Sequence, residues 1–135
     1  MIHEPVFLYV EDDPDCRAIL QMLLVRVLGY KALYVFEDSS EFMERLKALP
    51  EKPDICFFDI HVKPYNGFEM LRMVREDATY KDTLVVAVTA SMMHERVHML
   101  REAGFDSMIP KPLDMEIFPD LLTRILNGEQ TWNGM

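Results

Sequence analysis

The feature that most constrains this chain is a short apolar run that ends in a carboxylate. Residues 55–58 are apolar and lead into Asp59, with Pro53 before them and Pro64 and Gly67 after them. A run of this length between turn residues predicts a strand buried on both faces, as in parallel sheets covered by helices. Asp59 then lies at the edge where α/β sheets bind ligands. An aspartate there is a metal ligand, a nucleophile or a helix cap, and this run alone leaves all three open.

Four more segments predict strands: residues 6–10, 31–36, 84–89 and 107–110. Helical patterns follow each strand, which gives five strands alternating with five helices. Right-handed crossovers between parallel strands then predict an α/β fold with one parallel sheet covered on both faces. The pattern does not determine the order of the strands.

The helices are predicted from caps, breakers and apolar spacing. Asp13 and Pro14 predict an N-cap and first turn, and Gly29 predicts the end of that helix. Residues 38–41 are typical of a capping box for the second helix. Pro119 predicts that the main part of the last helix begins near Phe118. The predicted inward stripes of the first and fourth helices are Ile19, Leu20, Leu23, Leu24, Val27 and Leu28, and Met93, Val97 and Leu100.

Length and composition indicate one domain over residues 4–126, followed by a polar, flexible tail over 127–135. The net charge of −9 argues against nucleic acid and anionic membrane surfaces as partners. Cys56 lies in the buried run, so we expect a free thiol in a reducing compartment. The sequence shows neither a leader nor a membrane span, which favours the cytoplasm.

The predicted strand ends carry a chemically consistent set of side chains. Glu11 and Asp12 follow the first strand, Asp59 ends the third, Thr89 ends the fourth and Lys111 follows the fifth. Oxygen ligands without histidine or cysteine suit Mg²⁺. A hydroxyl and an ammonium suit phosphoryl oxygens. The set predicts phosphoryl transfer in which Asp59 is the nucleophile.

In these positions the chain resembles the CheY-like receiver domains of bacterial two-component response regulators. The resemblance covers residues 4–126 and implies a flavodoxin-like (βα)5 three-layer sandwich with a five-stranded parallel sheet. The matching residues, each at a strand end or in the loop that follows, are Glu11-Asp12, Asp59, Gly67, Thr89-Ala90 and Lys111-Pro112.

The resemblance implies a role for each residue around the phosphorylation site. Asp59 is the phosphoacceptor and binds Mg²⁺ together with Asp12. The backbone carbonyl of His61 is a third protein ligand, and Glu11 acts through water. Asp13 is assigned to the helix cap because the acidic pair of the family directly follows the apolar run.

The resemblance also implies a conformational switch and its partners. Lys111 contacts the phosphoryl group, and its bond to Pro112 is cis. Thr89 couples that group to the face formed by the fourth helix, the fifth strand and the fifth helix. The phosphodonor is a sensor histidine kinase or a phosphotransfer protein. We expect a stand-alone receiver that is no enzyme beyond self-phosphorylation and autodephosphorylation, with a downstream protein partner or a homodimer on that face.

Three departures from the family pattern stand out. Met108 occupies the position of the usual aromatic switch residue. Lys63 stands where the loop proline is usual, and Pro64 comes one residue later. His61 and Ser91 occupy the two variable positions associated with the lifetime of the phosphoryl group.

Two other functions are alternatives. The departures leave open a module of the same fold that binds partners without phosphorylation. The segment His94 to His98, with Glu95, matches the H-E-x-x-H motif of zinc peptidases. The inward stripe of its helix turns both histidines toward solvent or the helix edge, so the zinc peptidase is the remote alternative. No glycine-rich phosphate loop follows the first strand, which argues against a nucleotide-dependent enzyme.

Overall fold

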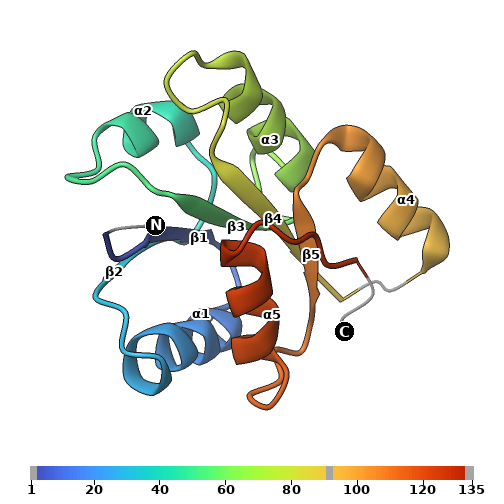
Figure 1. Ribbon diagram of the computed structural model, residues 1–135. Helices are drawn as coiled ribbons and strands as arrows, with labels where there is room; N and C mark the ends of the chain where they lie inside the picture. Colours follow the sequence, from blue (N-terminus) through green and yellow to red (C-terminus); the bar gives the residue numbers. More distant parts are fainter. Residues whose placement is uncertain (1–2, 91–92, 133–135) are drawn as a thin grey trace.

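The structure is a computed structural model that describes residues 3–90 and 93–132, except the side chain of His94. Five parallel strands form one sheet in the order β2-β1-β3-β4-β5, which confirms the predicted fold class (Figure 1). The strands are β1 (Val6–Val10), β2 (Ala32–Phe36), β3 (Ile55–Asp59), β4 (Leu84–Thr89) and β5 (Ser107–Pro110). β1 and β3 are neighbours at the centre, so the two acidic strand ends lie side by side.

Helices cover both faces of the sheet, as the crossovers require (Figure 1). They are α1 (Pro14–Gln21) with its continuation η1 (Met22–Val27), α2 (Phe42–Lys47), α3 (Gly67–Glu76), α4 (His94–Ala103) and α5 (Phe118–Leu126). Buried side chains of α1, η1 and α5 form one hydrophobic cluster with the sheet, and those of α2, α3 and α4 form the other.

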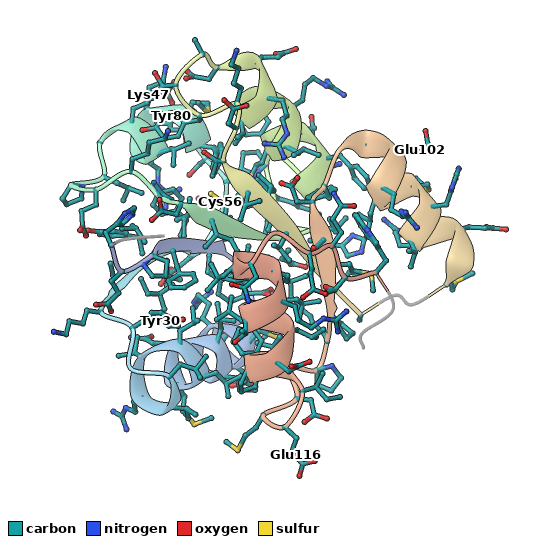
Figure 2. All side chains as sticks on the ribbon, viewed as in Figure 1. Tyr30, Lys47, Cys56, Tyr80, Glu102 and Glu116 are labelled. Atoms are coloured by element: carbon teal, nitrogen blue, oxygen red, sulfur yellow. The ribbon has the colours of Figure 1, made fainter. Side chains whose placement is uncertain are left out.

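The central strand β3 contributes to both clusters. Ile55 and Phe57 point to the α1 and α5 side, while Cys56 and Phe58 point to the α2 and α3 side. The alternation follows from the two-residue period of a strand. Cys56 lies within the sheet (Figure 2) and is a buried free thiol, as predicted; burial raises its pKa to about 12.

The first helix differs from the prediction in its second half. η1 is a π-helix, in which the N–H of Leu28 donates to the carbonyl of Leu23, five residues back. The wider turn changes the phase of the apolar residues. Leu20, Leu23 and Leu24 are buried, whereas Ile19 and Val27 are exposed. The predicted stripe is therefore wrong at those two positions.

The starts of α2 and α4 also correct the prediction. The residue before α2 is Glu41, with a positive φ of 49° and no side-chain cap, so residues 38–41 form no capping box. Asp38 instead accepts hydrogen bonds from the N–H and Oγ of Ser40. Met93 precedes α4 and is 66% exposed, so it lies outside the inward stripe, which keeps Leu100 and the half-buried Val97.

The C-terminal part combines a confirmed prediction with a difference. α5 begins at Phe118 with Pro119 in its first turn, as predicted. The segment after α5 returns to the sheet, where Thr131 is buried against β5. This position differs from the flexible tail expected from the polar composition. Within residues 3–90 and 93–132, no helix is both long and apolar enough to span a membrane.

Candidate functional site

Three carboxylates meet at the carboxyl ends of β1 and β3. One oxygen of each of Glu11, Asp12 and Asp59 lies within 4.8 Å of the others. Glu11 is fully buried and Asp59 is 5% exposed, whereas Asp12 faces solvent. The group follows from sheet order, because β1 and β3 are hydrogen-bonded neighbours. Carboxylates this close repel one another unless a cation neutralises them.

Lys111 provides one such cation from the end of β5. Its Nζ lies 2.7 Å from Oε1 of Glu11 and 3.3 Å from Oδ1 of Asp59. Burial disfavours the charged form of Lys111, but the hydrogen bond to Glu11 and the charges of Asp59 and Glu11 outweigh it and raise its pKa. The ammonium therefore stays charged beside Asp59 at neutral pH. The Lys111–Pro112 bond is cis, as predicted, and so is the Lys63–Pro64 bond in the loop that departs from the family pattern.

Tyr9 also belongs to this site, although in the sequence it is only one residue of the apolar run 6–10. Its hydroxyl donates a 2.6 Å hydrogen bond to Oε1 of Glu11, the same oxygen that Lys111 contacts. Burial and the hydrogen bond to Glu11 raise the pKa of Tyr9, so the phenol remains a neutral donor. Because side chains two apart on a strand share a face, the spacing of Tyr9 and Glu11 was the available signal.

Thr89 and Lys111 join the ends of β4 and β5. The backbone N–H of Lys111 donates to the carbonyl of Thr89 at 2.9 Å, and Thr89 is 2% exposed. β4 lies beside β3, with Val88 opposite Asp59. Four of the predicted residues, Glu11, Asp59, Thr89 and Lys111, are thus buried or half-buried at one edge of the sheet.

The loop after β3 carries His61 and leads to α3. His61 is exposed immediately beyond Asp59 and Ile60. Asn66 caps α3, and its capping box with Glu69 was not predicted. Asp13 is the N-cap of α1, as predicted, and its side chain accepts from the N–H of Asp15, which lowers the pKa of Asp13.

The H-E-x-x-H segment forms the N-terminal part of α4, which begins five residues after the end of β4 (Figure 1). His98 is exposed, as predicted, with Nε2 3.9 Å from Oε1 of Glu102, which points outward in Figure 2. The side chain of His94 lies outside the described part of the structure. Among the described residues, the acidic group that could hold a metal is Glu11, Asp12 and Asp59.

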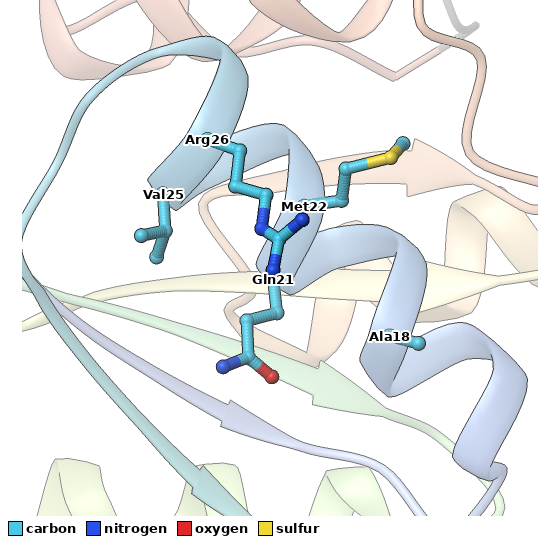
Figure 3. Close-up of a pocket in the computed structure, with 5 residues that line it drawn as sticks. All are labelled: Ala18, Gln21, Met22, Val25 and Arg26. Carbon is cyan, nitrogen blue, oxygen red and sulfur yellow. The ribbon is translucent and has the colours of Figure 1, made fainter.

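A separate surface pocket lies along α1 and η1 (Figure 3). Its lining offers an amide, a guanidinium and apolar groups, without a carboxylate. Neither a hard-cation site nor an acyl-phosphate nucleophile can be built from this lining. The strand ends therefore remain the candidate site. The lining residues are Ala18, Gln21, Met22, Val25 and Arg26.

Comparison with known proteins gives a family for this arrangement. The family model of the response regulator receiver domain matches residues 7–124. The chain is 26% identical over 126 residues to the probable C4-dicarboxylate response regulator DctR of Halalkalibacterium halodurans, a match that spans 92% of this chain and 53% of that relative. It is also 26% identical to the chemotaxis protein CheY1 of Helicobacter pylori, over 88% of this chain and 94% of CheY1.

A solved structure shows the same fold. The chemotaxis response regulator CheY4 of Vibrio cholerae superposes with a TM-score of 0.79 at 22% identity, over 91% of this chain and 99% of CheY4. The chain thus spans about half the length of DctR but nearly all of the two chemotaxis proteins.

Proposed function

The chain belongs to the response regulator receiver family, and we propose that it is a switch that accepts a phosphoryl group on Asp59. The observation that carries the proposal is the position of that carboxylate. Asp59 ends the central strand β3 beside Glu11 and Asp12, with the ammonium of Lys111 3.3 Å from its Oδ1. A nucleophile, a metal-binding set and a cation for phosphoryl oxygens therefore meet at one point.

The proposed donor is a phosphohistidine of a sensor histidine kinase or phosphotransfer protein. A carboxylate oxygen of Asp59 attacks the phosphorus, and a P–O bond forms as the P–N bond breaks. The bonding electron pair stays on the imidazole nitrogen, and Asp59 carries an acyl phosphate. Lys111 offsets the charge of the phosphoryl oxygens. Hydrolysis by water restores the carboxylate and releases inorganic phosphate.

The acidic set fits a magnesium ion by the chemistry of its donors. All three side chains offer carboxylate oxygens, and the exposed Asp12 leaves the set open to water, which Mg²⁺ retains. We assign Asp12, Asp59 and the backbone carbonyl of His61 as ligands, with Glu11 acting through water. When bound, Mg²⁺ supplies positive charge that neutralises carboxylate and phosphoryl oxygens.

The proposed output follows from the ends of β4 and β5. A phosphoryl group on Asp59 adds negative charge beside Lys111, whose backbone is hydrogen-bonded to Thr89. Movement of Thr89 and Lys111 changes the surface formed by α4, β5 and α5. We propose that a downstream protein, or a second copy of the chain, binds that surface.

The test is the intact mass of the chain after incubation with acetyl phosphate, with and without Mg²⁺. We expect the gain of one phosphate that requires Mg²⁺ and is absent from Asp59→Asn. Asp13→Asn is the matched control, since Asp13 caps α1 and should leave the gain intact. Phosphate uptake by Asp59→Asn equal to that of the parent would contradict the proposal.

The alternative of a module independent of phosphorylation has a different outcome. The parent chain would gain no mass with acetyl phosphate, and beryllofluoride with Mg²⁺ would leave its tryptophan emission spectrum unchanged. Met108 motivates this alternative, because it stands at the usual aromatic position and is fully buried.

A further inference from the structure

The C-terminal segment covers the free edge of the sheet. β5 is an edge strand, and its outer backbone groups would otherwise be open to pairing with another chain. The N–H of Met108 donates to the carbonyl of Thr131 at 2.8 Å, and Oγ1 of Thr131 donates to the carbonyl of Met108 at 3.2 Å. The N–H of Thr131 donates to Oγ of Ser107 at 3.0 Å. Thr131 is 1% exposed although it directly follows the polar residues Glu129 and Gln130.

Trp132 extends this contact from β5 to α4. Its ring packs on the hydrophobic cluster that contains Leu100 and Met108, and the guanidinium of Arg101 lies 5.3 Å from the ring centroid. Figure 1 shows the segment after α5 crossing β5 toward α4. We call the surface formed by Leu100, Arg101, Ser107 and Met108 the β5–α4 face. Residues 130–132 occupy this face through one backbone–backbone hydrogen bond, two hydrogen bonds that involve the hydroxyls of Ser107 and Thr131, and the ring of Trp132.

We propose that the β5–α4 face is a binding site for an extended peptide segment, that residues 130–132 fill it in the unphosphorylated chain, and that phosphorylation of Asp59 releases them. The inference rests on the proposed function. Strand addition at a sheet edge takes its affinity from main-chain hydrogen bonds and its specificity from side-chain pockets. The freed face then accepts an extended segment of a partner protein.

A short chain of contacts connects the face to Asp59. Met108 lies opposite Ala87 of β4, three residues before Lys111. The N–H of Lys111 holds the end of β4 at Thr89, while its Nζ contacts Asp59. A phosphoryl group that pulls on Lys111 and Thr89 therefore acts on the two strands that position Met108. Linkage requires the reverse effect, so release of the segment must favour phosphorylation by the same factor.

The first experiment uses Trp132, which is the single tryptophan of the chain. We expect beryllofluoride with Mg²⁺ to move its emission to longer wavelength and to lower its anisotropy in the parent chain but not in Asp59→Asn. Unchanged emission in a parent chain that acetyl phosphate modifies at Asp59 overturns this inference and leaves the proposed function intact. Absence of any modification contradicts the proposed function instead.

The second experiment releases the segment without phosphorylation. Thr131→Asp places an unpaired carboxylate in a buried position, which expels the segment and keeps the tryptophan as a reporter. We expect red-shifted emission at rest and tighter binding of beryllofluoride, measured by calorimetry in the presence of Mg²⁺, by about fivefold or more. Thr79→Asp, at an exposed position after α3, is the matched control and should resemble the parent in both measurements. Equal affinities of Thr131→Asp and Thr79→Asp for beryllofluoride overturn the coupling.

The third experiment tests the face as a peptide site. A labelled peptide of residues 127–132 is added in trans, and its anisotropy is measured. We expect it to bind Thr131→Asp more tightly than the parent, because the parent's own segment competes for the β5–α4 face. Absence of binding to a folded Thr131→Asp chain overturns the peptide site.

Discussion

Two donors share one oxygen of a fully buried carboxylate, Oε1 of Glu11. The hydroxyl of Tyr9 lies 2.6 Å from it and Nζ of Lys111 lies 2.7 Å from it. A buried carboxylate is costly unless it is paired and hydrogen-bonded. Glu11 therefore holds Lys111 at the carboxyl edge beside Asp59, and Tyr9 holds Glu11. On this view Tyr9 is a positioning residue for the proposed phosphorylation site.

Tyr9→Phe keeps the aromatic packing and removes one donor from Glu11. We expect the free energy of unfolding in urea to fall by roughly 1.5–3 kcal/mol, the range for a hydrogen bond to a charged group. Tyr34→Phe is the matched control, because its hydroxyl donates to Glu51 at the surface and should matter little. Equal losses in the two variants would show that Tyr9 does not support Glu11.

Site residues were predictable from the sequence where a reactive or charged side chain stands at the end of a predicted strand. Asp59 and Lys111 could be found because each stands where an apolar run meets a charged residue. Tyr9 was missed because an apolar run hides a hydroxyl that points along the sheet to the site. Its two-residue spacing from Glu11 carries the information, but that spacing matters only once Glu11 is known to be buried.

At the scale of elements, all five strands and the start of α5 at Phe118 were predictable. Their signals are local: apolar runs of strand length, and a proline that excludes the preceding helical turn. The π-helix η1 and the left-handed conformation of Glu41 were not predictable. Apolar spacing assumes a regular α-helix, and tertiary packing selects a different local geometry at these two places. The docking of Thr131 was hidden because one hydroxyl residue in a polar stretch carries no burial signal.

Gly67 starts α3 where the loop passes against the end of β3. A Cβ at this position would lie 2.8 Å from Cδ1 and 3.0 Å from Cα of Ile60, and 3.2 Å from the carbonyl oxygen of Asp59. We expect Gly67→Ala to lower stability by about 1–3 kcal/mol, as overpacking does, and to slow modification of Asp59 by acetyl phosphate.

Gly104→Ala is the control for Gly67→Ala, because it introduces backbone strain without a close contact to Ile60 or Asp59. A Cβ at Gly104 meets open space, but its φ of 107° is unfavourable for alanine. This variant should lose stability in urea while Asp59 is modified at the parent's rate. Equal slowing in both variants would contradict a role for the contact with Ile60.

Asp77 links the end of α3 to α2 and predicts a dependence on pH. Its carboxylate lies 3.0 Å from Nζ of Lys47 and accepts from the N–H of Thr79. These interactions, led by that with Lys47, lower the pKa of Asp77. A lowered native pKa stabilises the fold above the ordinary value of about 3.9 and loses that effect as pH falls through the native value.

Asp77→Asn measures this contribution. The difference in the free energy of unfolding between parent and variant should be largest near pH 6 and shrink toward pH 3. Denaturation in urea at both pH values provides the comparison. A difference that stays constant over this interval would show that the charge of Asp77 contributes nothing.

For the whole molecule, strand order is the property that local patterns do not contain. Several orders of five parallel strands share the same alternation of strands and helices. The observed order makes β1 and β3 neighbours and β5 an edge. The first fact assembles Glu11 with Asp59, and the second creates the edge that Thr131 covers. Both the site and its proposed regulation therefore depend on long-range pairing.

Glu11, Asp12 and Asp59 place three carboxylates together, and the single ammonium of Lys111 offsets only part of their charge. The remaining repulsion opposes folding until a further cation binds. Mg²⁺ that binds the native state stabilises it by mass action, by roughly 2.7 kcal/mol at a hundred times its dissociation constant. We expect thermal unfolding of the parent to shift upward with Mg²⁺ and to return when EDTA is added.

Asp12→Asn tests whether this cluster is the origin of the shift. Removing one carboxylate relieves repulsion, so the variant should unfold at a higher temperature than the parent in EDTA and respond weakly to Mg²⁺. Asp82→Asn removes the same charge at an exposed position outside the cluster and should keep the full response. Mg²⁺ stabilises the fold only through the site that it binds in the native state. An equal rise in the unfolding temperature of Asp12→Asn and of the parent would therefore show that the ion binds elsewhere.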